Sequence, residues 1–166
     1  MAYFDLENVM QEIKDKLIDI DLGLNSRIAA INLEKAPTDI VNYGSSAAIN
    51  LINNDDIYFL IANQVTNNTN QFLIFTIDKW EADELGAVTL SIGIHIVFTS
   101  DNDFHDNIKA LRYMRALRQT LEYNRYASLP SQVARIKIIQ PVAYKENDNK
   151  SWVEIGCVVE TMFAQV

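Results

Sequence analysis

Cysteine is almost absent from this sequence: Cys157 is the only one among 166 residues. An intramolecular disulfide is therefore excluded, and so is a metal site built from several cysteines. Cys157 falls on an apolar position of an alternating stretch. A free thiol behaves there as a small hydrophobic side chain, so we expect Cys157 to pack in the core.

Glycine is also scarce, and the five glycines lie far apart, at positions 23, 44, 86, 93 and 156. A nucleotide-binding loop needs closely spaced glycines at the start of a helix, so this class of site is excluded. Ser45 and Ser46 follow Gly44, but the residues around them lack the nucleophile-elbow pattern of a hydrolase.

Histidine occurs twice, as His95 and His105. His105 lies near Asp103 and Asp106, a cluster that either binds a metal ion or places acids at a helix N-terminus, where the helix dipole favours them. We prefer the second interpretation. No catalytic constellation is found in the sequence, so we expect that the protein is not an enzyme and that it uses no cofactor and no metal.

Long apolar runs are missing as well, and basic residues are outnumbered by acidic ones. No stretch approaches twenty uncharged apolar residues, and residues 1–20 are interspersed with charges, which predicts neither a membrane span nor a signal peptide. The formal net charge of −8 argues against broad, sequence-independent nucleic-acid binding. We therefore expect a protein made in the cytoplasm.

Hydrophobic periodicity predicts two long helices, over residues 6–22 and 104–126. Asp5 and Asp103 are suitable N-caps, and Gly23 is a suitable stop signal for the first helix. The expected buried stripes are Leu6, Val9, Ile13, Leu17 and Ile20 in the first helix, and Ala110, Met114, Leu117 and Leu121 in the second.

Alternating and apolar runs predict about five strands, and the clearest of them covers residues 88–98. Two shorter runs, 57–62 and 72–77, flank the polar stretch 65–71 and predict a hairpin with a long tip. Two more strands are expected at 133–142 and 152–163, joined by the polar residues 144–151.

The order of these elements predicts a single α+β domain over residues 1–166. We expect a mostly antiparallel sheet of about five strands, with the N-terminal helix and the second long helix packed on one face. Residues 25–56 contain Pro37, Gly44 and many Asn and Ser residues. For this segment we expect a long ordered connection with one short element.

A basic stripe runs along the second predicted helix of this otherwise acidic protein, formed by Lys109, Arg112, Arg115 and Arg118. Three interpretations are open. The stripe is a solvated helix face with an Arg118–Glu122 pair, a contact for acidic surface on a neighbouring copy, or the lining of a channel through which nucleic acid passes. These four residues are our candidates for a subunit interface or channel.

The C-terminal half resembles a known family. A long alternating strand, VTLSIGIHIVF (88–98), leads into an acid-capped helix with the pattern ALRYMRALRQTL (110–121), and the last strand region reads WVEIGCVVETMFA (152–164). Together with the leading helix, this order is similar to the tail terminator proteins of tailed bacteriophages, also called tail completion or neck proteins. The resemblance covers residues 1–24 and 57–164 and leaves 25–56 unmatched.

This resemblance implies a structural virion protein. Copies of the chain would form a homo-oligomeric ring, commonly a hexamer, at the head-proximal end of the tail. The ring would join the tail tube to the head connector, and DNA would pass through it. The implied partners are other copies of the chain, tail-tube and head-connector proteins, and passing DNA, with no membrane.

Three alternatives stay open from the sequence. The chain is another phage component of the head-completion or baseplate kind, a small-molecule-binding α+β module, or an enzyme that uses unrecognised residues. A small-molecule site would draw on Tyr58, Trp80 and His95, and an enzyme on His95 and His105.

Overall fold

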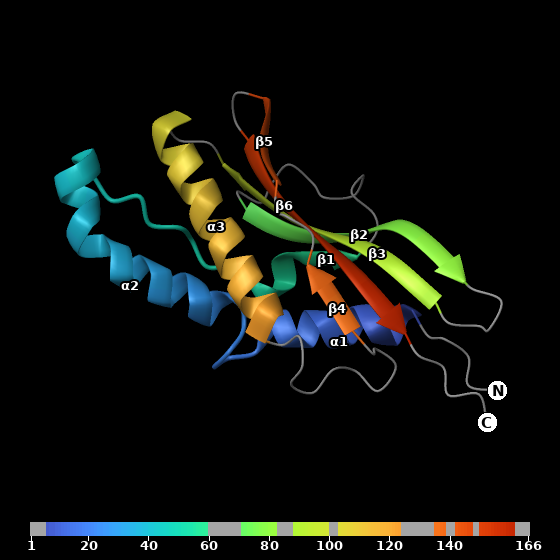
Figure 1. Cartoon of the computed structure of the whole chain (residues 1–166). Coiled ribbons are helices and arrows are strands. Elements are labelled where there is room, and N and C mark those ends of the chain that lie inside the picture. The colour runs from blue at the N-terminus through green and yellow to red at the C-terminus, as the bar shows by residue number, and fades with distance from the viewer. Residues whose placement is uncertain are drawn as a thin grey trace.

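The computed structural model describes residues 6–59, 71–82, 88–99, 103–123, 135–138, 142–147 and 150–161. These residues form an α+β fold with long helices beside a mixed sheet (Figure 1), which confirms the α+β class of the predicted fold. The elements are, in chain order, α1 (Leu6–Ile18), α2 (Leu24–Tyr43), the 3-10 turn η1 (Asn54–Asp56), β1 (Ile57–Phe59), β2 (Gln71–Ala82), β3 (Val88–Thr99), α3 (Asp103–Tyr123), β4 (Arg135–Ile138), β5 (Val142–Asn147) and β6 (Lys150–Thr161).

The long strands β2, β3 and β6 form the middle of the sheet, whose order is β1-β2-β3-β6-β4. β3 pairs antiparallel with both β2 and β6, and the alternation predicted for residues 88–98 is confirmed as a strand. The other edge of β6 is shared by β4 and β5, which pair antiparallel with different parts of it.

The pairing at both ends of the sheet differs from our expectation. β1 runs parallel to β2, so residues 57–62 and 72–77 do not form the predicted hairpin. The predicted connection over residues 144–151 is wrong in its bounds, because β5 extends to Asn147 and β6 begins at Lys150. Polar residues of the β5–β6 pair resemble a loop in sequence, but edge strands tolerate such residues because one side faces water. Of the expected tip at 65–71, residues 65–70 lie outside the described residues, and Gln71 is the first residue of β2.

The core lies between the helices and one face of the sheet. On that face β3 contributes alternate residues, Ile92, Ile94 and Ile96, which are fully buried together with Leu73 and Phe75 of β2. All three helices add side chains to the same cluster. The opposite face of the sheet carries a smaller apolar cluster formed by Phe72, Ile74 and Val97, with Tyr58 packed against it.

The first helix is shorter than predicted and ends at Ile18. Ile13 and Leu17 are buried as expected, whereas Ile20 is 89% exposed and does not belong to the buried stripe. The Asp19 carboxylate accepts hydrogen bonds from the backbone N–H groups of Asp21 and Leu22, which ends α1 in a tight turn. The side chains of Leu6 and Val9 lie outside the described residues.

The twenty-residue helix α2 is the largest departure from the sequence prediction. It contains Pro37 and ends at Gly44, which adopts a left-handed conformation with φ 71°. Sequence reasoning missed this helix for two reasons. Proline normally interrupts helices, and apolar residues occur on both faces of α2, so that no single apolar stripe stands out.

Polar side chains on α2 hold the extended segment 45–53 in place. The side-chain amide of Asn25 donates to the carbonyl oxygen of Ile52 and accepts from its N–H, and Asn32 pairs in the same way with Ile49, over 2.8–3.0 Å. Asp39, a further seven residues along, accepts a hydrogen bond from the N–H of Ala47. Seven residues are close to two helical turns, so the three side chains lie on one side of α2 and replace a β-strand partner for this segment.

The helix α3 forms where it was predicted, over Asp103–Tyr123. Ala110, Leu117 and Leu121 are buried as expected, and Met114 is partly buried against the same core. The predicted residues 124–126 lie outside the described part. No helix among the residues that the structure describes is long and apolar enough to cross a membrane.

Candidate assembly surface on α2 and α3

Arg112, one of the four candidate interface residues, lies in the interior between α2 and α3. Its guanidinium donates two hydrogen bonds to the Asp39 carboxylate, at 2.9 and 2.5 Å, and a third to the carbonyl oxygen of Ala47. Both charged side chains are almost fully buried. Arg112 therefore connects α3, α2 and the extended segment of its own chain, and it is not part of an exposed basic stripe.

The Asp39 carboxylate makes this buried contact sensitive to acid. Hydrogen bonds from Arg112 hold the pKa of Asp39 below its ordinary value, against the opposing effect of burial. A carboxyl whose pKa is depressed by folding stabilises the fold above its unfolded pKa of about 4, and this contribution is lost as the pH falls through the folded value.

We expect the urea midpoint of the wild type to fall steeply as the pH is lowered from about 5 to about 3. An Asp39→Asn variant should be less stable at neutral pH and should lose less of its midpoint over the same interval. Asp55→Asn, which changes an exposed carboxylate, is the matched control and should follow the wild type. An Asp39→Asn variant with the full wild-type acid dependence would contradict this role.

Arg115 lies on the outer part of the contact between the two helices. It donates two hydrogen bonds to the Glu34 carboxylate of α2, at 3.1 and 2.6 Å, and Lys35 approaches the same carboxylate at 2.9 Å. The hydrogen bonds from Arg115, which have the larger effect, and from Lys35 lower the pKa of Glu34 to about 2. Because two cations share one carboxylate, this exposed group keeps a net positive charge at neutral pH.

The other two candidates have different partners. Arg118 is exposed and donates to Glu122 on the next turn of α3, at 2.7 Å, as the sequence predicted. Lys109 lines a small hollow of about 170 Å³ together with Asn50, Gln71 and Tyr113. The four basic residues therefore have different partners, and because Arg112 is buried they do not form one exposed stripe.

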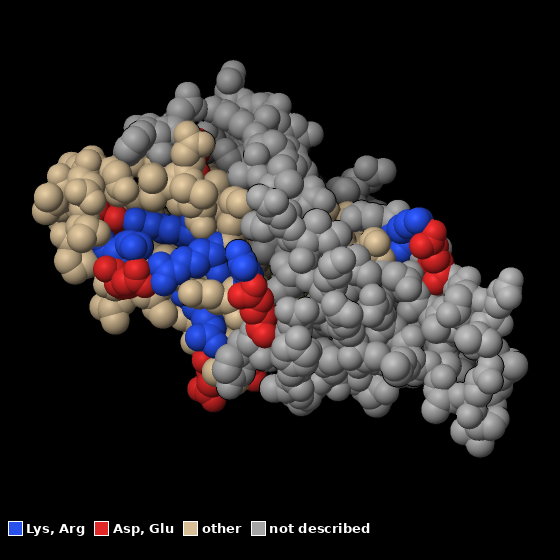
Figure 2. Space-filling view, in the orientation of Figure 1, with Lys and Arg blue, Asp and Glu red and all other residues tan. Residues whose placement is uncertain are grey.

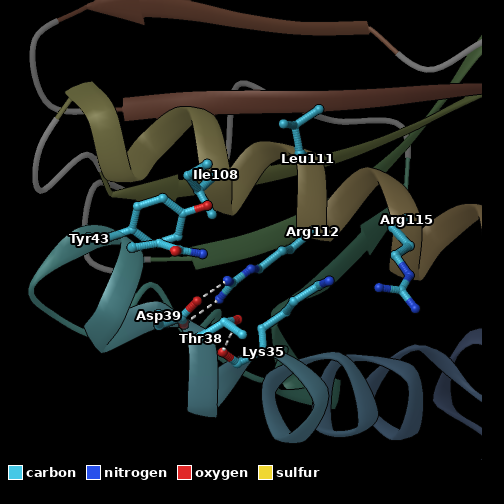
Figure 3. A pocket seen from close by; sticks show the side chains of 9 residues that line it. Lys35, Thr38, Asp39, Tyr43, Ile108, Leu111, Arg112 and Arg115 are labelled. Atoms are coloured by element: carbon cyan, nitrogen blue, oxygen red, sulfur yellow. Dashed lines mark hydrogen bonds and ion pairs between the residues drawn. The ribbon is translucent and has the colours of Figure 1, made fainter.

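An open groove separates the C-terminal half of α2 from the N-terminal half of α3 (Figure 3). Its volume is about 250 Å³. Ile108 and Leu111 of α3 provide apolar lining, and Leu111 is 60% exposed. Lys35 and Arg115 also line the groove, in the region where Lys and Arg side chains gather over α2 and α3 in Figure 2.

The outward face of α2 is apolar although it is exposed to solvent. Leu33, Ile40 and Val41 are 79%, 69% and 82% exposed, on the side of the helix opposite the buried Ile28 and Ile31. The remaining exposed members of this face are also small or apolar: Ala29, Ala30, Ala36 and Pro37. We name these seven residues the outer face of α2. Contiguous exposed apolar surface of this kind marks a contact site more often than chance.

The residues considered for a small-molecule site are only partly brought together. Tyr58 and His95 lie in one row across the sheet, on either side of Ile74. Tyr58 packs edge-on against Phe72, and the Nε2 atom of His95 lies 2.9 Å from the hydroxyl of Thr76. Structural roles therefore account for these contacts of both residues. The side chains of Trp80 and Cys157 lie outside the described residues.

The structure adds a contact that the sequence did not predict, between the Ser45 hydroxyl and the Nε2 atom of His105, at 3.1 Å. It joins the end of α2 to the start of α3. Among the described residues, no group of three or more His, Cys, Asp and Glu side chains is arranged to hold a metal ion.

Tyr113 was another residue that sequence reasoning overlooked. Its buried hydroxyl accepts from the Asn50 N–H, and its single proton lies within reach of two acceptors, the side-chain oxygen of Gln71 at 2.9 Å and the carbonyl oxygen of Asn50 at 3.1 Å. Burial raises the pKa of this phenol. Tyr113 therefore secures the extended segment against α3 from the side opposite α2.

The chain matches no known protein family and no curated protein sequence.

Proposed function

We propose that the chain is a structural virion protein of the tail-terminator type, not an enzyme. In this proposal the whole chain is one domain with a mostly antiparallel sheet and its helices on one face, and copies of it form a ring, commonly a hexamer, at the head-proximal end of a phage tail. The ring joins the tail tube to the head connector, and DNA passes through it. The order of elements that resembles this family supports the proposal.

The outer face of α2 is the observation that carries the assembly role. A soluble monomer rarely leaves a whole helix face apolar and exposed, whereas subunits of stable assemblies do so because a neighbour covers it. In the proposal the neighbouring subunit covers this face. The net positive group at Glu34, Lys35 and Arg115 is available for acidic surface on another copy, one of the alternatives that the sequence left open.

The alternatives have weaker support. The groove between α2 and α3, at about 250 Å³, is smaller than the pockets of about 300–1,000 Å³ that usually bind small molecules. A head-completion or baseplate component would share the exposed face of α2 but would lie at a different position in the virion.

Negative-stain electron microscopy and mass photometry of the purified protein test the proposal. We expect closed rings of one defined mass, and we expect antibody-gold to label the joint between head and tail in virions that contain the protein. A double variant, Leu33→Ser with Ile40→Ser, should remain folded because both side chains are exposed, but should lose most of the ring population.

Leu51→Ser is the matched control, because Leu51 is an exposed leucine (57%) outside α2, and it should form rings like the wild type. Gold at the distal end of the tail would replace the proposal by the baseplate alternative. A wild type that never forms a discrete oligomer would contradict the ring.

A further inference from the structure

The turn between α1 and α2 presents an isoleucine between two acids. Ile20 is 89% exposed, and Asp19 and Asp21 flank it. An isoleucine side chain that stays exposed at the tip of a turn contributes no free energy of apolar burial to the fold of its own chain. We name these three residues the acidic knob.

The acidic knob is held in one conformation by its own hydrogen bonds. The Asp19 carboxylate accepts from two backbone N–H groups, and the Ser26 hydroxyl donates to the carbonyl oxygen of Asp21 at 2.8 Å. Gly23 closes the turn by donating to the carbonyl oxygen of Asp19 at 3.0 Å. A rigid turn loses little conformational entropy on binding, which favours its use as a contact.

The groove between α2 and α3 has the complementary chemistry. Ile108 and Leu111 offer an apolar lining for one aliphatic side chain, and Lys35 and Arg115 supply positive charge beside it. The charge balance also fits. Two cations share Glu34, and the Arg112–Asp39 pair is internally neutral, so the groove retains net positive charge for the two acids of the knob.

The acidic knob and the groove lie at opposite ends of α2. The knob precedes the first residue of α2, and the groove is lined by residues from Lys35 to Tyr43 near its other end (Figure 1). At 1.5 Å per residue these sites are roughly 25 Å apart, so they cannot meet within one chain. A contact between them joins two copies head to tail, and such heterologous contacts generate closed rings or open filaments.

Resting on the proposed ring, we infer that the acidic knob of one copy inserts into the α2–α3 groove of the next copy. Ile20 contacts Ile108 and Leu111, while Asp19 and Asp21 face Lys35 and Arg115. One knob buries too little area for a stable interface on its own, so it acts as the hot spot of a larger contact.

Two complementary variants test the head-to-tail geometry. Ile20→Asp disables the knob and leaves the groove intact, and Leu111→Asp does the reverse. Each variant changes an exposed side chain and should keep the wild-type melting temperature. In analytical ultracentrifugation each variant alone should be monomeric. Their equimolar mixture should form a 1:1 dimer and nothing larger, because only one productive knob–groove pair is available.

A charge exchange tests the polar part of the contact. Asp21→Lys and Lys35→Glu should each weaken self-association by about tenfold, and the double variant should recover most of it. Asp21 suits this test because its backbone groups make the hydrogen bonds of the turn. Leu51→Asp, outside both sites, is the control and should assemble like the wild type.

The outcomes separate this contact from the ring proposal. Wild-type rings that survive both Ile20→Asp and Leu111→Asp would overturn the knob–groove contact and leave the ring standing. Open filaments that both variants disperse would support the contact and contradict the closed ring. A wild type that stays monomeric up to about 1 mM would overturn both, because even a weak contact with that dissociation constant would then be populated.

Discussion

Replacing Arg112 by alanine is expected to reduce the free energy of unfolding by about 3–5 kcal/mol, the usual cost of breaking a buried ion pair from one side. The variant leaves the Asp39 carboxylate buried without its main partner, and the carbonyl oxygen of Ala47 loses a hydrogen bond. Urea unfolding at neutral pH measures the change. Arg118→Ala, which removes an exposed partner of Glu122, is the matched control and should cost less than about 1 kcal/mol.

Removing both charges should be less harmful than the two single changes predict. In a variant with Asp39→Leu and Arg112→Met no unpaired charge remains buried at this contact. The N–H and carbonyl groups of Ala47 still lose their side-chain partners, so the double variant should stay less stable than the wild type. Additive losses in this double-mutant cycle would contradict the interpretation that the two charges stabilise each other.

Gly23→Ala is expected to cause the second large loss, about 3 kcal/mol or more, through steric overlap. A Cβ atom at this position would lie 2.3 Å from the carbonyl oxygen of Asp19 and 2.5 Å from that of Leu17. The first belongs to the turn and the second to the last turn of α1, and neither backbone atom can move aside without distorting its element. The same urea experiment measures the loss, and the distorted turn should also weaken self-association through the acidic knob.

Gly44 provides the control for this prediction. Glycine is favoured at this position by the backbone conformation and not by a lack of space for a Cβ atom. It has a positive φ of 71°, and among the described residues no atom lies within 4 Å of the place where a Cβ atom would stand. Gly44→Ala should cost about 1–2 kcal/mol, and Gly44→Asn less, since asparagine tolerates the left-handed conformation. A smaller loss at Gly23 than at Gly44 would show that the turn adapts to the added methyl group.

Sequence periodicity predicted the elements that have one buried face. β3 and α3 each contact the core with one face only. The alternation of β3 and the stripe containing Ala110 and Leu117 in α3 therefore each show one clear hydrophobic period. α2 has a buried face and an apolar outer face, and its apolar residues therefore show no clear period. Two of its three asparagines, Asn25 and Asn32, suggested a loop because their partners are backbone groups of a distant segment.

The candidate interface could be predicted only in part, for a related reason. Periodicity placed Arg112 and Arg115 on α3, but burial depends on the helix packed beside it, and α2 was not foreseen. Asp39 lies 73 positions before Arg112 in the chain, and no local pattern links such residues. The acidic knob was also hidden, because Ile20 continues the spacing of the buried stripe of α1 beyond the point where the helix ends.

The side-chain bonds from Asn25, Asn32 and Asp39 to the extended segment also constrain the order of folding. On the side that faces α2, the peptide groups of this segment bond to side chains of the helix, so they find these partners only after α2 has wound at least two turns. Helices form within about a microsecond, far faster than long-range pairing. We therefore expect α2 to form first and residues 45–53 to pack on it afterwards; the segment then leads the chain to β1 at the edge of the sheet.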